Sequence, residues 1–448
     1  MSRYLFFVVV GLGVYAPLVF PMLLGRIKLH SLYGWMLVSA SLGLVGRPTY
    51  LLLFSDDRSF DESLFWRDVP LGEFLLPAAF LGLANLCLVG AYIVSVAKSP
   101  NRAGGVRRQE HYGAMQFVSF LVALVGILGA VLFVQATGGF DISSLSTKRV
   151  VASDRAISAG LQSVGVPLAL GRSGLIASVV LLHLRRSNGL TGGYGYALLV
   201  ANLFLPFYAS DRTGVLLVGL QLFALASFAS KKLDRRKIVA GCAVALILLQ
   251  LLTALRVAGR SDQALSFSGV EGSVEVLVRN RSFFDLSKNL QIPRAVGDEL
   301  ELEFGATLSG AVFGPVPRSV WPEKPIVSVG PEIGQKVYGN AVTGVPPGLI
   351  GEAFWNFHVF GIGMVIIAGA IFGRLDRFEP ESLSPFFQAV FALLVLPVAY
   401  NSVGSSFSGV ALDLYRDGLT LAILWFGHLL LSGRGSQKTR RRDIEVVS

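Results

Sequence analysis

Apolar segments of about 20 residues recur along most of this 448-residue chain, and they constrain its fold more than any other feature. An α-helix of about 20 residues spans the hydrocarbon core of a bilayer. Because that core offers no water to the backbone, such segments cross it as helices whose hydrogen bonds are internal. The chain is 53% hydrophobic and only 15% charged, whereas about 25% of the residues of a soluble protein are charged. We therefore expect an all-α polytopic membrane protein.

The pattern of apolar segments predicts eleven membrane spans. They are expected near residues 4–24, 32–54, 72–97, 113–136, 162–184, 194–210, 211–230, 238–256, 348–373, 385–403 and 409–431. The first is expected to be a retained helix, since no small-residue cleavage pattern follows it. The fifth contains Pro167, Arg172 and several glycines, which predicts an interrupted helix. The sixth and seventh nearly touch, which predicts a tight helical hairpin.

Basic residues in the loops orient these spans, because cytoplasmic loops carry an excess of lysine and arginine. Basic groups occur at 26–28, 98–108, 185–186, 231–237, 374–377 and 438–442. With eleven spans, every group falls on the cytoplasmic side if the amino terminus is outside and the carboxyl terminus is inside. Since these residues sit in short loops, the net charge of +10 does not indicate a nucleic-acid partner.

Four regions follow from this topology. Residues 1–256 hold eight helices, 257–347 form a long external segment, 348–431 hold three helices, and 432–448 form a basic cytoplasmic tail. The external segment far exceeds a usual connection of about 4–6 residues. It contains "VPRSVWPEKP" at 316–325, whose three prolines exclude a long regular helix. This stiff, charged loop is either a spacer or part of a site.

Ionisable residues inside apolar segments are candidate functional groups, because burying a charge costs several kcal/mol without a partner or water. Arg47, Arg172, Arg212 and Glu352 all fall towards the outer ends of their predicted spans. Asn356 follows Glu352 by four residues and Trp355 lies beside it, so the acid and the amide share a helical face. The alternative is that these side chains snorkel to the interface at helix ends. His358, deeper in the same span, is expected to be a packing residue.

Cations outside the membrane form a second candidate group. They are Arg149, Arg155, Arg279, Arg281, Arg294, Arg318 and Lys324. The planar guanidinium of arginine binds phosphate and pyrophosphate through paired hydrogen bonds. The alternative is a solvated surface neutralised by acidic neighbours. The sequence contains no DxD pair, HExxH, GxSxG or Walker A motif, so we expect no metal and no cofactor, and any reaction needs a donor that is already activated.

Several of these motifs resemble the O-antigen polymerase family, the oligosaccharide repeat-unit polymerases of bacteria. "VPRSVWPEKP" is similar to the family's P-R-x-x-W-P-x-K-P signature, and "GEAFWNF" (351–357) is similar to its G-E-x-x-x-N-F segment. "SDRTG" (210–214) is similar to a conserved turn of the family. Arg149 with Gly160, and Arg294 with Gly305, match an R-x10-G pattern that some members carry. His358 departs from the family, which usually has glycine there.

The resemblance implies a fold, a location and an activity. The fold would be GT-C-like, in the bacterial inner membrane. The enzyme would be a metal-independent glycosyltransferase that joins repeat units carried on undecaprenyl pyrophosphate into O-antigen or exopolysaccharide, outside that membrane. Its partners would be these lipid-linked oligosaccharides, membrane lipid and a chain-length regulator protein.

The resemblance also implies site residues. Glu352 would be the general base and Arg318 the second catalytic residue, while Arg212 and Arg172 would join Arg318 on the pyrophosphate. The remaining expected substrate-binding residues are Arg149, Arg294, Lys324, Trp321, Asn356 and Trp355, of which Trp321 and Trp355 would stack on sugars.

Three other functions stay open. A ligase of the same broad fold would transfer finished polysaccharide, but ligases of this kind tend to use an external histidine, and the long external segment has none. A flippase or transporter of the lipid-linked unit would need ionisable groups near the middle of the membrane, whereas those found here crowd one face. A structural assembly partner would leave the external arginines unexplained.

Overall fold

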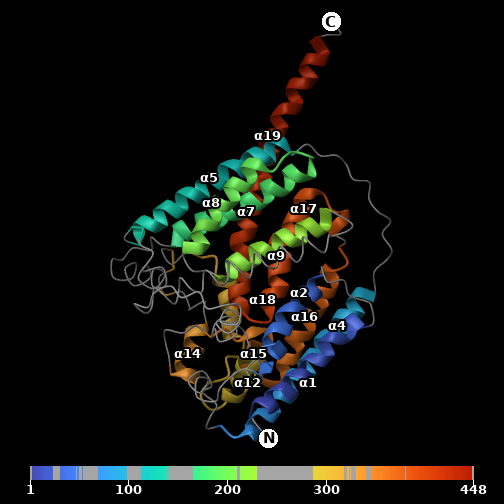
Figure 1. The fold of residues 1–448 in the computed structure, drawn as a ribbon, viewed down its shortest axis with the longest axis vertical. Coiled ribbons are helices and arrows are strands. Elements are labelled where there is room, and N and C mark those ends of the chain that lie inside the picture. Colours follow the sequence, from blue (N-terminus) through green and yellow to red (C-terminus); the bar gives the residue numbers. More distant parts are fainter. Residues whose placement is uncertain are drawn as a thin grey trace. The chain divides into compact units, whose positions relative to one another are not determined.

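A computed structural model describes most of the chain (Figure 1). The described residues are 3–23, 31–46, 48–49, 53, 69–97, 112–137, 139–140, 165–208, 212–229, 286–316, 320–321, 323, 329–339, 345–378 and 380–445. In this part of the chain every regular element is a helix, which confirms the all-α prediction. Within the described residues, six helical stretches are long and apolar enough to cross a membrane: Leu5–Leu23, Leu71–Ala97, Gly113–Ala136, Gly165–Ser187, Gly348–Ser382 and Pro385–Ser402. The predicted span at 238–256 lies outside the described residues.

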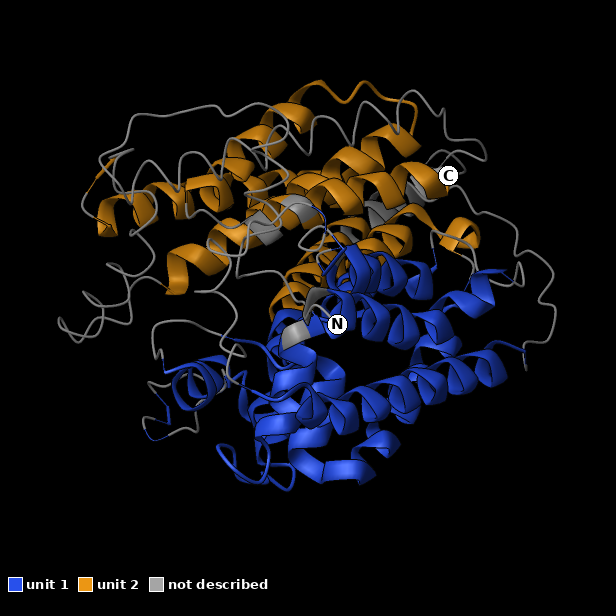
Figure 2. Ribbon diagram, turned by 60° about the horizontal axis from the view of Figure 1, so that its bottom comes forward, with its two compact units in different colours: residues 1–103, 278–379, 395–415 blue, residues 104–277, 380–394, 416–448 orange. Residues whose placement is uncertain are grey.

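The chain divides into two compact units, which Figure 2 shows in different colours. Unit 1 comprises residues 1–103, 278–379 and 395–415, and unit 2 comprises residues 104–277, 380–394 and 416–448. Helix α19 (Phe407–Glu445) contributes its first residues to unit 1 and the rest to unit 2.

Unit 1 contains the "GEAFWNF" segment at 351–357 and the helices around it. Its elements before the external segment are α1 (Arg3–Leu23), α2 (Leu32–Ala40), η1 (Ser41–Gly46), η3 (Leu71–Phe74) and α4 (Leu75–Ala97). Those within and after it are α12 (Leu286–Ala295), α13 (Ala306–Phe313), α14 (Gly330–Tyr338), α15 (Gly348–Phe357), η4 (His358–Gly361), α16 (Ile362–Leu375) and α18 (Leu396–Ser402). α4 and α16 pack closely, because Gly369 lies against the Leu88 carbonyl and a Cβ there would collide with it.

A half-buried carboxylate joins three helices of unit 1. Asp376, which caps the end of α16, accepts hydrogen bonds from the backbone N–H groups of Leu32 at 2.7 Å and Tyr33 at 3.2 Å. It also accepts one from the Tyr92 hydroxyl of α4 at 2.8 Å. The first two donors are N–H groups at the start of α2, which have no acceptor within that helix, and a negative charge is favoured at this end. Asp376 therefore fixes α2 against α4 and α16.

Unit 2 is built around α5 (Gly113–Ala136), α7 (Gly165–Ser187) and α8 (Gly193–Tyr208), which lie side by side (Figure 1). α9 (Arg212–Ala229), η5 (Pro380–Ser382), α17 (Pro385–Val390) and most of η6 (Phe391–Val395) complete its described part. The Asn202 amide of α8 donates to Ala123 O and to Ser178 Oγ, both at 3.1 Å, and so ties the three helices together.

The prediction that the fifth span is interrupted is wrong. α7 is one continuous helix over Gly165–Ser187. Pro167 stands in its first turn, where backbone N–H groups make no hydrogen bond within the helix, so the missing N–H of proline breaks none. The glycines serve close packing instead, because a Cβ at Gly174 would collide with Gly126 of α5, and a Cβ at Gly126 would collide with Gly174. Small residues of this kind let membrane helices approach each other closely.

Candidate functional site

Glu352 lies at the centre of unit 1, on a helix that is buried on every side. All residues from 351 to 356 of α15 are buried, and Glu352 itself is 0% exposed. Its Oε1 accepts a hydrogen bond from Thr307 Oγ1 of α13 at 2.8 Å. Its Oε2 accepts one from the backbone N–H of Phe407, the first residue of α19. The carboxylate thus caps α19 and holds α13 at the same time.

Asn356 completes this network, as its spacing of four residues from Glu352 predicts. The Gly305 N–H donates to Asn356 Oδ1 at 2.9 Å, which fixes the orientation of the amide. Asn356 Nδ2 then donates to Thr307 Oγ1 at 2.7 Å and to the Glu352 carbonyl at 2.8 Å. Since the Thr307 hydroxyl accepts from the amide, its single proton goes to Glu352. Both oxygens of the carboxylate therefore act as hydrogen-bond acceptors.

Trp355 joins the same helix to the loop that precedes α13. Its indole Nε1 donates to Glu301 O at 2.8 Å, and its carbonyl accepts from the Glu303 N–H at 3.2 Å. The side chain is 0% exposed, packed in a cluster with Ile292, Leu300 and other apolar residues. In this arrangement Trp355 positions the loop, and sugar stacking by Trp355 stays a prediction that needs the loop to move.

Arg294, in the last turn of α12, has two acidic partners. Its guanidinium contacts Glu299 at 2.7 Å and Glu73 at 3.3 Å, and its side chain is 13% exposed. A pyrophosphate would have to compete with both carboxylates for this arginine. Gly305, which matches Arg294 in the R-x10-G pattern, contributes its N–H to Asn356, so the segment between the two links Glu73 to α15.

The proline-rich loop falls only partly within the described residues. Trp321 is described, and its ring meets Phe313, the last residue of α13, edge to face with centroids 5.2 Å apart. Arg318 and Lys324 lie outside the described residues. α13 therefore carries the Glu352 network at its first turn and an aromatic contact with the loop at its end.

The substrate-binding arginines predicted before residue 257, Arg149, Arg172 and Arg212, belong to unit 2, and Arg47 lies outside the described residues. Arg172 forms a two-pronged ion pair with Asp417 of α19, with Nε to Oδ1 at 2.7 Å and Nη2 to Oδ2 at 2.6 Å. The neighbouring Ser173 and Thr420 hydroxyls lie 2.8 Å apart. Arg212 begins α9, but its side chain is outside what the structure describes, as is the whole of Arg149.

His358 interrupts the predicted ninth span. Its φ is 52° and its ψ is −136°, a conformation that glycine adopts and residues with a Cβ avoid. The break separates α15 from α16, and the His358 ring lies 4.5 Å from the ring of Phe354. The residue that departs from the family pattern thus sits where the backbone itself favours glycine.

Three glutamates lie in or near the loop at 301–303: Glu301, Glu303 and Glu332. Burial raises the pKa of Glu303, and the nearby charge of Glu332 raises it further. The pKa of Lys336 is also raised, chiefly by its hydrogen bond to Glu332 at 2.8 Å. Among the described residues, no group of three or more histidine, cysteine, aspartate or glutamate side chains is placed to hold a metal ion.

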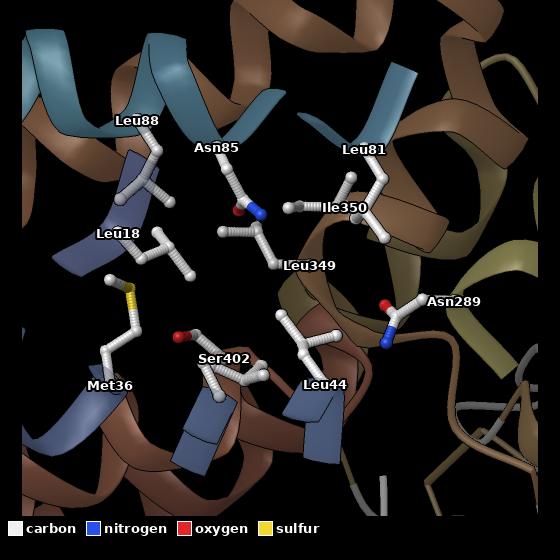
Figure 3. A pocket seen from close by; sticks show the side chains of 12 residues that line it. Leu18, Met36, Leu44, Leu81, Asn85, Leu88, Asn289, Leu349, Ile350 and Ser402 are labelled. Atoms are coloured by element: carbon white, nitrogen blue, oxygen red, sulfur yellow. The ribbon is translucent and has the colours of Figure 1, made fainter. Parts of the chain in front are cut away.

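A mostly apolar pocket in unit 1 is lined in part by Leu349 and Ile350, which precede Glu352 on α15 (Figure 3). Twelve residues line it: Leu18, Met36, Ala40, Leu44, Leu81, Asn85, Leu88, Asn289, Leu349, Ile350, Ser402 and Val403. None is charged, and the Asn85 amide already donates to Val14 O at 2.9 Å. This pocket therefore lacks the groups that bind a pyrophosphate, and Glu352 is not among its lining residues.

Sequence reasoning missed two partners. Thr307 stands in an uncharged segment, and nothing in its surroundings in the sequence signals a hydrogen bond to Glu352. Asp417 did carry a signal, because an acidic residue in a predicted span needs a cation, and Arg172 in another span needs an anion.

Comparisons with protein-family models, with curated proteins and with solved structures found no match to this chain.

Proposed function

We propose that the protein is a polymerase of lipid-linked oligosaccharides, acting on undecaprenyl-pyrophosphate-linked repeat units in the bacterial inner membrane. The proposal includes eleven spans, with the amino terminus outside and the carboxyl terminus in the cytoplasm. The observation that carries it is the Glu352 network. The "GEAFWNF" segment supplies the acid and the amide of a buried network whose hydroxyl is that of Thr307 of α13. The end of α13 contacts Trp321 in the described part of the proline-rich loop.

The proposed reaction transfers a growing glycan from its carrier to a sugar hydroxyl of the next unit. The hydroxyl oxygen bonds to the anomeric carbon, the bond from that carbon to the phosphate oxygen breaks, and undecaprenyl pyrophosphate leaves with the electron pair. Glu352 accepts the proton of the hydroxyl as general base. Arginines stabilise the charge on the leaving pyrophosphate, and Arg318, Arg212 and Arg172 are the residues proposed for this role.

The geometry sets a condition on this mechanism. Glu352 is enclosed, and each carboxylate oxygen already accepts a hydrogen bond. The acceptor hydroxyl must therefore approach an unused lone pair, or replace Thr307 as the donor to Oε1. Replacement requires α13 to shift, since Thr307 belongs to its first turn.

The proposal is tested in a strain that lacks the gene, complemented with the wild type, with Glu352→Gln or with Arg318→Ala. Surface polysaccharide is separated on a gel, with protein levels measured in parallel. Each substitution is expected to collapse the ladder to a single repeat unit. A complete ladder from Glu352→Gln at normal protein level would exclude the general-base role.

Two matched controls separate chemistry from folding. Glu332→Gln removes a partly exposed carboxylate of unit 1 and is expected to leave the ladder intact. Asp376→Asn perturbs another carboxylate that caps a helix. It should lower the amount of protein without changing the length of the polysaccharide chains that the remaining protein makes.

Full-length chains left on the carrier would indicate a ligase instead, and repeat units held on the cytoplasmic face would indicate a flippase.

A further inference from the structure

The helix α13 has two distinct faces, although it lies in the segment that the sequence assigns to the outside. One face is buried and consists of Thr307, Gly310, Ala311 and Gly314. The opposite face consists of the exposed or half-exposed residues Ala306, Ser309, Val312 and Phe313. A helix that faces water on one side normally presents charged residues there. This exposed face has none.

The surrounding sequence strengthens the contrast. No charged residue occurs among residues 305–316. Large apolar side chains near both ends of this stretch are strongly exposed, with Phe304 at 80%, Val312 at 68% and Val320 at 75%. Phe304 also has a φ of 45°, which is unusual for a residue with a Cβ. Exposed apolar residues that gather in this way mark an interaction surface.

The position of α13 indicates what covers this surface. Gly305 lies beside Phe357, whose ring would be 3.4 Å from a Cβ at the glycine. Phe357 ends α15, and exposed apolar residues on the same candidate span begin directly after it, at Val359 and Phe360, and extend to Ile371, before the basic group at 374–377. The start of α13 therefore lies at the end of the lipid-exposed part of this span.

We propose that the exposed face of α13, together with Phe304 and Val320, rests in the boundary between lipid headgroups and acyl chains. Interfacial helices bury an apolar face at this depth, and their contact is with lipid. The start of α13 lies beside the end of α15, directly before the exposed residues Val359 and Phe360. This binding surface is independent of the proposed polymerase activity. Its effect is to hold Thr307, and with it Glu352, at the membrane surface.

Spin labelling at Val312 tests the proposal. Val312→Cys is made in a chain whose two cysteines, Cys87 and Cys242, are replaced by serine. The labelled protein is reconstituted into vesicles of phosphatidylethanolamine and phosphatidylglycerol. Power saturation then compares collisions of the nitroxide with oxygen, which concentrates in lipid, and with a nickel chelate, which stays in water.

Two labelled controls bracket the result. Ile367→Cys is 62% exposed on α16 and reports the lipid environment, while Gln335→Cys, on the exposed side of α14, reports water. The oxygen-to-nickel collision ratio at Val312 is expected to exceed that at Gln335 several-fold and to approach the value at Ile367. Ala306→Cys, on the same face, should give the same result and guards against a local effect of one label.

A ratio at Val312 equal to that at Gln335 would overturn the proposal, since the face would then be in water. Exclusion of both reagents would also overturn it, because the face would then be covered by protein. Neither outcome depends on catalysis, so the polysaccharide ladder tests the proposed function separately.

Discussion

The conformation of His358 predicts an unusual order of stability for two small substitutions. At most positions alanine is more stable than glycine, by about 0.5–1 kcal/mol, because glycine loses more backbone freedom on folding. At φ 52° and ψ −136° a residue with a Cβ carries strain of about 1–3 kcal/mol, which glycine does not. We therefore expect His358→Gly to be more stable than His358→Ala by about 1 kcal/mol, the difference between these two terms.

The comparison between the two variants isolates the backbone. Both remove the imidazole and its contact with Phe354, so the loss of that contact cancels. Val359 is the matched control, because it neighbours His358 and is 44% exposed without a positive φ. At Val359 the alanine variant should be the more stable of the pair.

The measurement is reversible unfolding of the purified protein in mixed micelles of a mild detergent and sodium dodecyl sulfate, followed by tryptophan fluorescence. If His358→Ala were as stable as His358→Gly or more so, the strain assigned to this position would be refuted. A reversal at His358 together with the ordinary order at Val359 would support it.

Three further predictions concern charged groups. Asp417→Asn should destabilise the protein by about 1–2 kcal/mol, because it removes the carboxylate that pairs with the half-buried Arg172, and Arg172→Asp combined with Asp417→Arg should recover part of that loss in the same unfolding assay. Asp376→Asn should cost about 1–2 kcal/mol, because the amide no longer matches the donors at the start of α2, and an unchanged unfolding midpoint would contradict this role. Since the pKa of Glu303 is raised in the folded protein, its contribution to stability is present below the unfolded pKa of about 4.3 and declines as pH rises through the raised value. Glu303→Gln should therefore flatten the dependence of the melting temperature on pH over this window, and a profile identical to the wild type would argue against the shift.

The helical class and most helix positions follow from the apolar pattern. The described helices α4, α5, α8 and α9 fall close to the predicted spans, since length and composition alone define such segments. The error at the fifth span has a physical cause. Proline and glycine read as breaks along a sequence, but Pro167 sits in a first turn and Gly174 meets another helix. Only tertiary packing separates these uses from a true interruption.

The candidate site was predictable where its residues share one helix. The spacing of Glu352 and Asn356 places both on one face, and the structure joins them through Thr307. The contribution of Thr307 could not be predicted, because it comes from a helix 45 residues away in the sequence. The break at His358 was equally hidden, since a helix can contain histidine and only the backbone angles reveal the turn.

The enclosure of Glu352 connects its structural role with its proposed chemical role. The carboxylate accepts hydrogen bonds from α13 and from the start of α19. It therefore holds together two helices that are far apart in the sequence. If Glu352 takes a proton from the acceptor sugar, as proposed, one oxygen becomes an O–H donor and accepts more weakly from Thr307 or Phe407. Proton uptake would then loosen either α13 or α19. Thr307→Val tests what the hydrogen bond from α13 contributes, because it removes that donor with little change in side-chain volume. It should lower polymer yield by less than Glu352→Gln does if the hydroxyl only orients the carboxylate, and a loss equal to that of Glu352→Gln would mean that the carboxylate cannot act without it.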